Sequence, residues 1–159
     1  MYEKLLNECY NNNVNVYEVD SNIKGLYYED TIFINKSLKT KEKTTILAEE
    51  LGHHYTLCKG NNILNQSKIE NIKNENKGRN WAYNKLVSLE KIIECYEKGI
   101  YTIYELSNEL GVDQEFFLDA INYFSRRYGT HVEIDNYIIN FNPLYVIKNL
   151  IKINRWCCS

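Results

Sequence analysis

The sequence predicts an α+β fold, in which a small antiparallel sheet packs on a long helix and a helical C-terminal half carries a late β-hairpin. Three patterns predict this class. β-Rich segments gather near the N-terminus, helical apolar spacing runs through the middle of the chain, and a β-rich segment follows the last long helical pattern. The 159 residues, 44% of them hydrophobic, suffice for one compact domain with its own core.

The N-terminal part is predicted to hold one helix and three strands. Residues 2–10 repeat apolar side chains at helical spacing and are followed by three asparagines, which favours a helix that ends there. Residues 14–19 alternate apolar and polar side chains. Residues 25–35 are typical of two strands joined by a turn at Glu29 and Asp30. These segments predict the small antiparallel sheet.

Helices are predicted next. The first begins near Thr40, a suitable N-cap, and ends near Gly60. The second covers residues 68–87 and leads into a third with the sequence LEKIIECYEKG. Each of these segments keeps an apolar stripe, which indicates helices that pack on a common core.

The C-terminal part is predicted as two helices, a hairpin and a final helix. Gly111 interrupts the helical pattern after residue 100, and Asp113 is the N-cap expected for the second helix. The segment HVEIDNYIINF is typical of a hairpin that turns at Asp135 and Asn136. A last helix is expected over residues 144–153.

Composition excludes several classes of protein. The formal net charge of -2 gives no general attraction to nucleic acid or to anionic lipid. No apolar run has the length of a membrane span or the form of a signal peptide, so a cytoplasmic protein is expected. The five cysteines form no CxxC pair, which favours reduced thiols over disulfides or a thiolate zinc site.

The segment LAEELGHHYT concentrates metal-capable side chains on the helix that begins near Thr40. Glu49 and His53 are four residues apart and share a face, and Glu50 lies on the same side. This is the geometry of the HExxH signature, with Glu49 in place of the first His. A solvated helix face is the other interpretation. His54 and Cys58 fall on or near the apolar stripe and are interpreted as packed side chains.

The following helix supplies a further carboxylate. Glu75 shares a stripe with Ile72, Gly78, Ala82 and Leu86 in the segment ENKGRNWA and its neighbours. An ionised carboxylate on a buried stripe needs a partner. A metal held by Glu49, His53 and Glu75 is one possible partner, and a salt bridge to Lys or Arg is the other.

These motifs resemble those of the ImmA/IrrE family of metallopeptidases, in a phage or mobile-element branch of clostridial type. LAEELGHHYT resembles the zinc helix, ENKGRNWA resembles the segment of the third ligand, and IYELSNELGV and YIINFNPL resemble the C-terminal half. The resemblance implies a zincin-like metallopeptidase core over residues 1–100 and a helical cap with a hairpin over residues 101–159, in one compact unit.

The resemblance also implies a function. Glu49, His53 and Glu75 would be the metal ligands, Glu50 the catalytic base, and zinc the metal, with Mn²⁺ or another divalent ion possible because Glu49 replaces the usual His. The expected activity is zinc-dependent endoproteolysis of a regulatory protein, typically a helix-turn-helix repressor. That replacement also leaves open a weak or inactive module that only binds the repressor.

Two further expectations concern surfaces. In metallopeptidases of this kind an edge strand beside the zinc helix receives the substrate backbone, and Thr31–Asn35 is the candidate strand. Residues 104–124 could form a DNA-binding helix-turn-helix, but they hold five acidic residues and no Lys or Arg. A cap that contacts the catalytic core or the protein substrate is therefore favoured over direct contact with nucleic acid.

Overall fold

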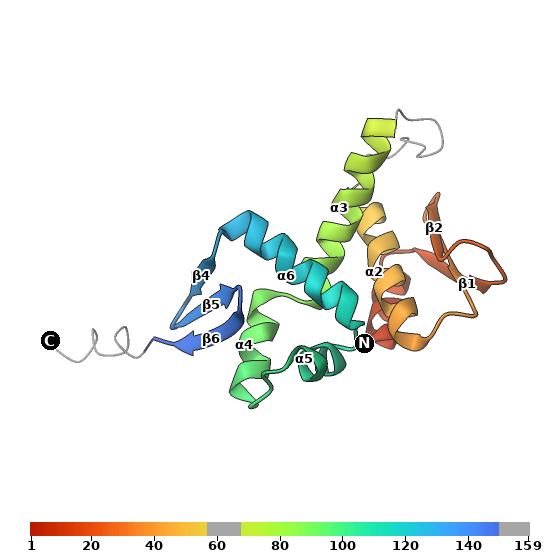
Figure 1. Ribbon diagram of the computed structural model, residues 1–159. Coiled ribbons are helices and arrows are strands. Elements are labelled where there is room, and N and C mark those ends of the chain that lie inside the picture. Colours follow the sequence, from red (N-terminus) through yellow and green to blue (C-terminus); the bar gives the residue numbers. More distant parts are fainter. Residues whose placement is uncertain (57–67, 150–159) are drawn as a thin grey trace, which may run out of the picture.

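The computed structural model describes residues 1–56 and 68–149 and confirms the α+β class. Its helices are α1 (Tyr2–Asn11), α2 (Thr40–Thr56), α3 (Lys68–Leu86), α4 (Leu89–Glu97), α5 (Ile103–Leu110) and α6 (Gln114–Tyr128). Its strands are β1 (Asn15–Val19), β2 (Gly25–Tyr28), β3 (Thr31–Asn35), β4 (His131–Ile134), β5 (Tyr137–Phe141) and β6 (Leu144–Lys148). The two small sheets lie on opposite sides of the helical body (Figure 1).

The N-terminal sheet has the order β1-β3-β2. β2 and β3 form the predicted antiparallel hairpin, with Gly25 opposite Ile34. β1 joins β3 in parallel, with Asn15 opposite Thr31, so the sheet is mixed rather than wholly antiparallel. The central strand β3 buries Ile32 and Ile34 completely against the helices.

Helix α2 packs on this sheet through Leu47, Ala48 and Leu51, all fully buried. It begins at Thr40 itself, and the preceding Lys39 donates its backbone N–H to the Glu42 carboxylate at 3.2 Å. Thr40, the predicted N-cap, is therefore the first residue of the helix, and Lys39 precedes it. α3 runs beside α2 (Figure 1). The predicted end of the first helix at Gly60, and Cys58, lie outside the described residues.

The C-terminal half matches the predicted helices but not the final one. Gly111 ends α5 in the left-handed conformation at φ 72°, and Asp113 occupies the N-cap position of α6. The predicted helix over residues 144–153 is wrong for residues 144–148, which form β6. The alternating sequence LYVIK pairs antiparallel with β5, so the predicted hairpin is the first part of a three-stranded sheet, β4-β5-β6. Residues 150–153 lie outside the description.

One continuous apolar core joins the two halves. It runs from Leu5 and Ile32 near the N-terminus through Leu86 to Phe117 and Ile139 in the C-terminal half. α6 packs on α3 and thereby connects the second sheet to the helix pair α2 and α3 (Figure 1). Within residues 1–56 and 68–149, none of the helices has the length and apolar character that crossing a membrane requires.

Candidate metal and catalytic site

Two glycines set the distance between α2 and α3. A Cβ atom at Gly52 would lie 2.9 Å from Gly78 Cα, and one at Gly78 would lie 2.7 Å from the Cε1 atom of His53. Carbon atoms in ordinary contact stay about 3.5–4.0 Å apart, so neither position accepts a larger residue without movement. The close approach brings the side chain of His53 on α2 to the face of α3 that carries Glu75.

His53 and Glu75 face each other across these helices. The His53 side chain is only 4% exposed, and its Nε2 atom lies 3.7 Å from Glu75 Oε2. Two donors that share a tetrahedral zinc ion at ordinary bond lengths are about 3.4 Å apart, so this separation suits a shared cation. His53 Nδ1 is buried and has no hydrogen-bond partner within the described part of the chain.

Glu75 is more exposed than its place on the helical stripe predicted. Its side chain is 56% exposed, and Ile72 on the same predicted stripe is 54% exposed. The buried part of the stripe begins at Gly78 and continues through Ala82 and Leu86. The prediction that Glu75 is a buried carboxylate in need of a partner is therefore wrong, although the predicted meeting of Glu75 with His53 is observed.

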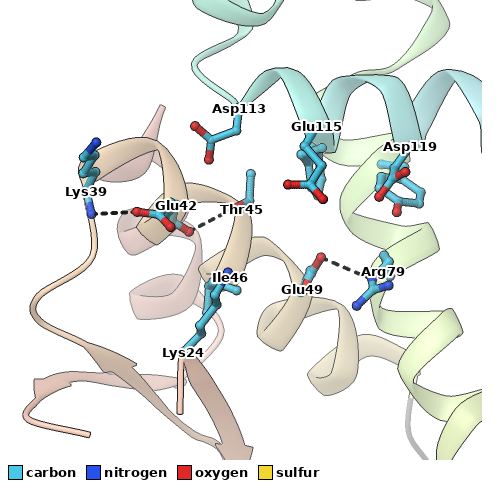
Figure 2. A pocket seen from close by; sticks show the side chains of 12 residues that line it. Lys24, Lys39, Glu42, Thr45, Ile46, Glu49, Arg79, Asp113, Glu115 and Asp119 are labelled. Carbon is cyan, nitrogen blue, oxygen red and sulfur yellow. Dashed lines mark hydrogen bonds and ion pairs between the residues drawn. The ribbon is translucent and has the colours of Figure 1, made fainter. Parts of the chain in front are cut away.

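Glu49 pairs with Arg79 of the neighbouring helix. Its Oε1 atom lies 3.5 Å from Arg79 Nε, and Figure 2 shows the carboxylate directed toward that guanidinium. Arg79 follows Glu75 by four residues on α3, so it offers a cation on the same helix face. Among the residues that the structure describes, no three His, Cys, Asp or Glu side chains gather closely enough to hold a metal ion.

Glu50 lies beneath the start of β2. A Cβ atom at Gly25 would be 2.3 Å from Ile46 Cγ2 and 2.7 Å from Glu50 Oε1, so a larger residue there would have to displace these side chains. Burial, supported by the negative charges of Glu75 and Glu49, raises the pKa of Glu50 to about 7, while His53 opposes the rise. A carboxylate with this pKa can hold or release a proton near neutral pH.

The remaining pKa shifts describe a site with excess negative charge. Burial raises the pKa of Glu49, although Arg79 and His53 act in the opposite direction. Burial alone would lower the pKa of His53, but the surrounding carboxylates, Glu75 first, raise it above its ordinary value. The pKa of Glu75 is lowered by His53. Three carboxylates close to one imidazole and one guanidinium therefore favour a further cation.

The residues fit a divalent metal in donor type and in charge. Imidazole nitrogen and carboxylate oxygen are ordinary zinc ligands, and two donors, His53 Nε2 and Glu75 Oε2, already face each other. The third predicted ligand, Glu49, is engaged by Arg79. The structure thus brings together two of the three predicted ligands, His53 and Glu75. Glu50 directly follows Glu49 on α2.

A hydrogen-bonded cluster beside the site was not predicted. The Tyr27 hydroxyl donates to Asp30 Oδ1 at 3.0 Å and lies 3.0 Å from His54 Nδ1, which is 3.2 Å from the same Asp30 oxygen. His54 is half-buried and attaches the β2–β3 turn to α2, so the prediction of a packed core histidine was only partly right. No sequence spacing signals this cluster, because it joins two elements far apart along the chain.

The candidate substrate strand must be corrected. Thr31–Asn35 is the central strand of its sheet and pairs with β1 on one side and β2 on the other, so it has no free edge. The open edge beside α2 belongs to β2, whose Gly25 lies against Ile46 and Glu50. The prediction failed because strand order in a sheet cannot be read from the order of strands in the sequence.

A cavity of about 590 Å³ opens between α2, α3 and the N-terminal turns of α6. Its lining includes Glu49 and Arg79 together with acidic residues of α6 (Figure 2). No motif in the sequence predicts a role for Arg79 or for these acidic residues. The one sequence signal for this acidic wall is the acidic composition of residues 104–124, which also argues against DNA binding.

Comparison with known protein families gives one match. The model described as IrrE N-terminal-like domain, Peptidase_M78, matches residues 13–122, from two residues before β1 to the middle of α6. Both helices of the candidate site lie inside the matched region. Searches of curated proteins and of solved structures gave no match.

Proposed function

Because the chain belongs to the IrrE N-terminal-like family of peptidases, we propose that it is a metal-dependent endopeptidase that cleaves a regulatory protein. The observation that carries this proposal is the juxtaposition of His53 and Glu75, with 3.7 Å between Nε2 and Oε2, next to a carboxylate whose pKa is about 7. This arrangement unites two metal donors with a base on one helix pair, as hydrolysis by a metallopeptidase requires.

Glu49, His53 and Glu75 are proposed to hold the metal. Zinc, when bound there, would polarise the scissile carbonyl and acidify a water molecule. Two carboxylates among three ligands shift the preference toward harder ions, so Mn²⁺ is a further candidate. Binding through Glu49 would recruit a carboxylate that already pairs with Arg79 through Oε1.

Glu50 is proposed as the general base. Its carboxylate would accept a proton from the attacking water and then deliver it to the nitrogen of the leaving amine, so that the peptide bond breaks and both products leave with balanced protons. A pKa of about 7 suits both steps. The open edge of β2 above α2 would hold the substrate backbone in an extended form.

The proposed substrate is a helix-turn-helix repressor of a phage or mobile element, as the family resemblance implies. Elemental analysis of protein purified without chelators should give about one divalent metal per chain. Co-expression with the repressor encoded beside the gene should then yield fragments, and Glu50→Gln should abolish the fragments while the metal stays bound. Metal binding without fragments from the native chain would contradict the proposal.

A second candidate function is a repressor-binding module with little or no catalysis. The Glu49–Arg79 ion pair favours it, because Arg79 then provides the positive charge that a metal would supply. In that case co-purification of repressor and native chain would persist in the presence of a strong chelator, and no fragments would form.

A further inference from the structure

We propose that the cavity between α2, α3 and α6 is a specificity pocket that binds a Lys or Arg side chain of the substrate polypeptide. This inference rests on the proposed function, because it assigns a substrate class to the same site. The cavity has a volume of about 590 Å³ and includes Glu49 in its lining, so a group bound there lies next to the proposed catalytic centre.

The shape and chemistry of the cavity suit a long cationic side chain. Ile46, Tyr83 and Phe116 supply apolar surface, and Tyr83 and Phe116 are almost fully buried. Lys and Arg combine an aliphatic stem with a charged end, so the stem can contact such surface while the charge reaches polar groups at the rim. A purely acidic or purely apolar side chain would leave one of these two surfaces without a matching partner.

The acidic residues that have no partner lie on α6. Asp113, Glu115 and Asp119 all line the cavity, and within the described residues none of them forms an ion pair or a side-chain hydrogen bond. Figure 2 shows Glu115 and Asp119 on the α6 side, above Glu49 and Arg79. Glu115 stabilises the helix N-terminus through the helix dipole, but Asp119 lies beyond the first turn, where that effect has faded.

Three cations also line the cavity, but they leave the α6 wall negative. Arg79 is already paired with Glu49 at 3.5 Å. Lys24 and Lys39 lie toward β2 and the start of α2, on the other side of the view in Figure 2. A substrate cation is therefore expected beside Glu115 and Asp119, where the carboxylates have no competitor. A helix-turn-helix protein supplies such side chains, because it approaches DNA phosphates with Lys and Arg.

A binding assay that does not depend on cleavage tests the pocket. The probes are a fluorescein-labelled tetralysine peptide and the same peptide with every lysine acetylated, which keeps the length and removes the charge. Fluorescence anisotropy measures both dissociation constants for the native chain, for Glu115→Gln/Asp119→Asn, and for the control Glu90→Gln/Glu94→Gln. The control pair occupies the matching second and sixth positions of α4, is exposed, and lies outside the cavity.

The native chain is expected to bind tetralysine at least five-fold more tightly than the acetylated peptide. The α6 double variant should lower that preference by about two-fold to ten-fold, as two lost exposed ion pairs imply, whereas the control should keep it. The single variants Glu115→Gln and Asp119→Asn should each give part of the loss. Thermal unfolding of all variants establishes that they are folded.

The pocket is rejected if the native chain binds both peptides equally, or if both double variants change the preference to the same extent. These outcomes are independent of catalysis. If binding depends on Glu115 and Asp119 while no protein is cleaved in the presence of any metal, the pocket is correct and the proposed peptidase activity is wrong. If the native chain cleaves the repressor but the α6 double variant keeps the full preference for tetralysine, the peptidase activity is correct and the pocket is wrong.

Discussion

At the residue scale, the ion pair between Glu49 and Arg79 sets part of the cost of binding a metal. The Glu49 side chain is 20% exposed and that of Arg79 is 50% exposed, so the pair is only partly screened by solvent. A cation that recruits Glu49 must compete with this guanidinium and also enters the field of its positive charge. Arg79 therefore opposes metal binding both by competing for Glu49 and by repelling the cation.

We expect Arg79→Gln to tighten the binding of Zn²⁺ by about three-fold to thirty-fold, because the competing charge is removed. Competition with a chromophoric chelator measures the affinity. Lys73→Gln is the matched control, since it removes one positive charge from an exposed position of the same helix and should change the affinity by less than about two-fold. Weaker zinc binding in Arg79→Gln would instead identify Arg79 as a residue that orients Glu49.

Glu50 links stability to pH in the metal-free protein. Its pKa is about 7 in the folded state against an ordinary value of 4.5, so the folded state holds this proton more tightly than the unfolded state does. The contribution of this proton to the free energy of unfolding is fully present below pH 4.5 and is lost as the pH rises through about 7. Above that pH the folded protein contains a half-buried carboxylate that is charged.

We therefore expect Glu50→Gln to increase the free energy of unfolding at pH 8 by about 1–3 kcal/mol in buffer with a chelator. Urea denaturation at pH 8 and at pH 5 measures the effect, and the gain should shrink at pH 5, where the native carboxyl is largely protonated. An equal gain at both pH values would show that the ionisation of Glu50 is not its cause.

At the scale of elements, the packing of α2 on α3 depends on Gly52 and Gly78. A methyl group at Gly52 meets the backbone of Gly78, which cannot rotate away as a side chain can. The two helices must then separate, and the separation also moves His53 away from Glu75. The contact therefore couples stability to the geometry of the site.

Gly52→Ala is expected to lower the free energy of unfolding by about 2–4 kcal/mol, at or above the upper part of the range for overpacked sites. Gly129→Ala is the comparison, because a Cβ atom there has no neighbour within 4 Å and costs only the strain of a backbone conformation, φ 85° and ψ -148°, that is essentially restricted to glycine, about 1–3 kcal/mol. Urea denaturation of both variants gives the two values. If Gly52→Ala lowers the free energy of unfolding no more than Gly129→Ala does, the close approach of α2 and α3 is not the reason that residue 52 must be glycine.

The sequence predicted most elements because their signals are local. Apolar spacing located the six helices that the structure describes, and a glycine and an aspartate marked the break between α5 and α6. The parallel pairing of β1 and the central position of β3 could not be predicted, since pairing depends on contacts distant in sequence. Residues 144–148 were predicted to be helical because a short apolar run fits the spacing of a helix as well as that of a strand.

The candidate site was predictable to a similar extent. Helical spacing placed Glu49, Glu50 and His53 together on α2 and brought Glu75 to the facing helix. The spacing could not show that Arg79 engages Glu49, because the rotamer of a side chain depends on its partners in space. Nor could it show the exposure of Glu75, which depends on where the neighbouring elements end.

At the scale of the whole molecule, the two halves share one core. Leu86 at the end of α3 and Val87 directly after it pack in the same cluster as Phe117 and Phe124 of α6. Removing the C-terminal half would expose this surface to water, at about 25 cal/mol for each Å² of apolar area. Residues on both sides of the predicted boundary at residue 100 thus contribute to one apolar core.

We expect a chain that ends at residue 100 to be unfolded or aggregated, and the full chain to unfold in one cooperative step. Hydrogen exchange measured by mass spectrometry should give α2 and α6 the same highest free energy of opening, within about 1 kcal/mol. A stable, monomeric fragment with native helical circular dichroism would contradict the shared core. So would the loss of protection in α6 at denaturant concentrations that leave α2 intact.

The close contacts at Gly25, Gly52 and Gly78 change how mutational scans of this protein should be designed. Replacement by alanine normally deletes a side chain and reports what that side chain contributed. At these three positions it inserts a methyl group against Glu50, the α3 backbone or the His53 ring. A survey restricted to charged and aromatic positions would overlook these glycines, although the absence of a Cβ atom at each of them allows the close packing of the site.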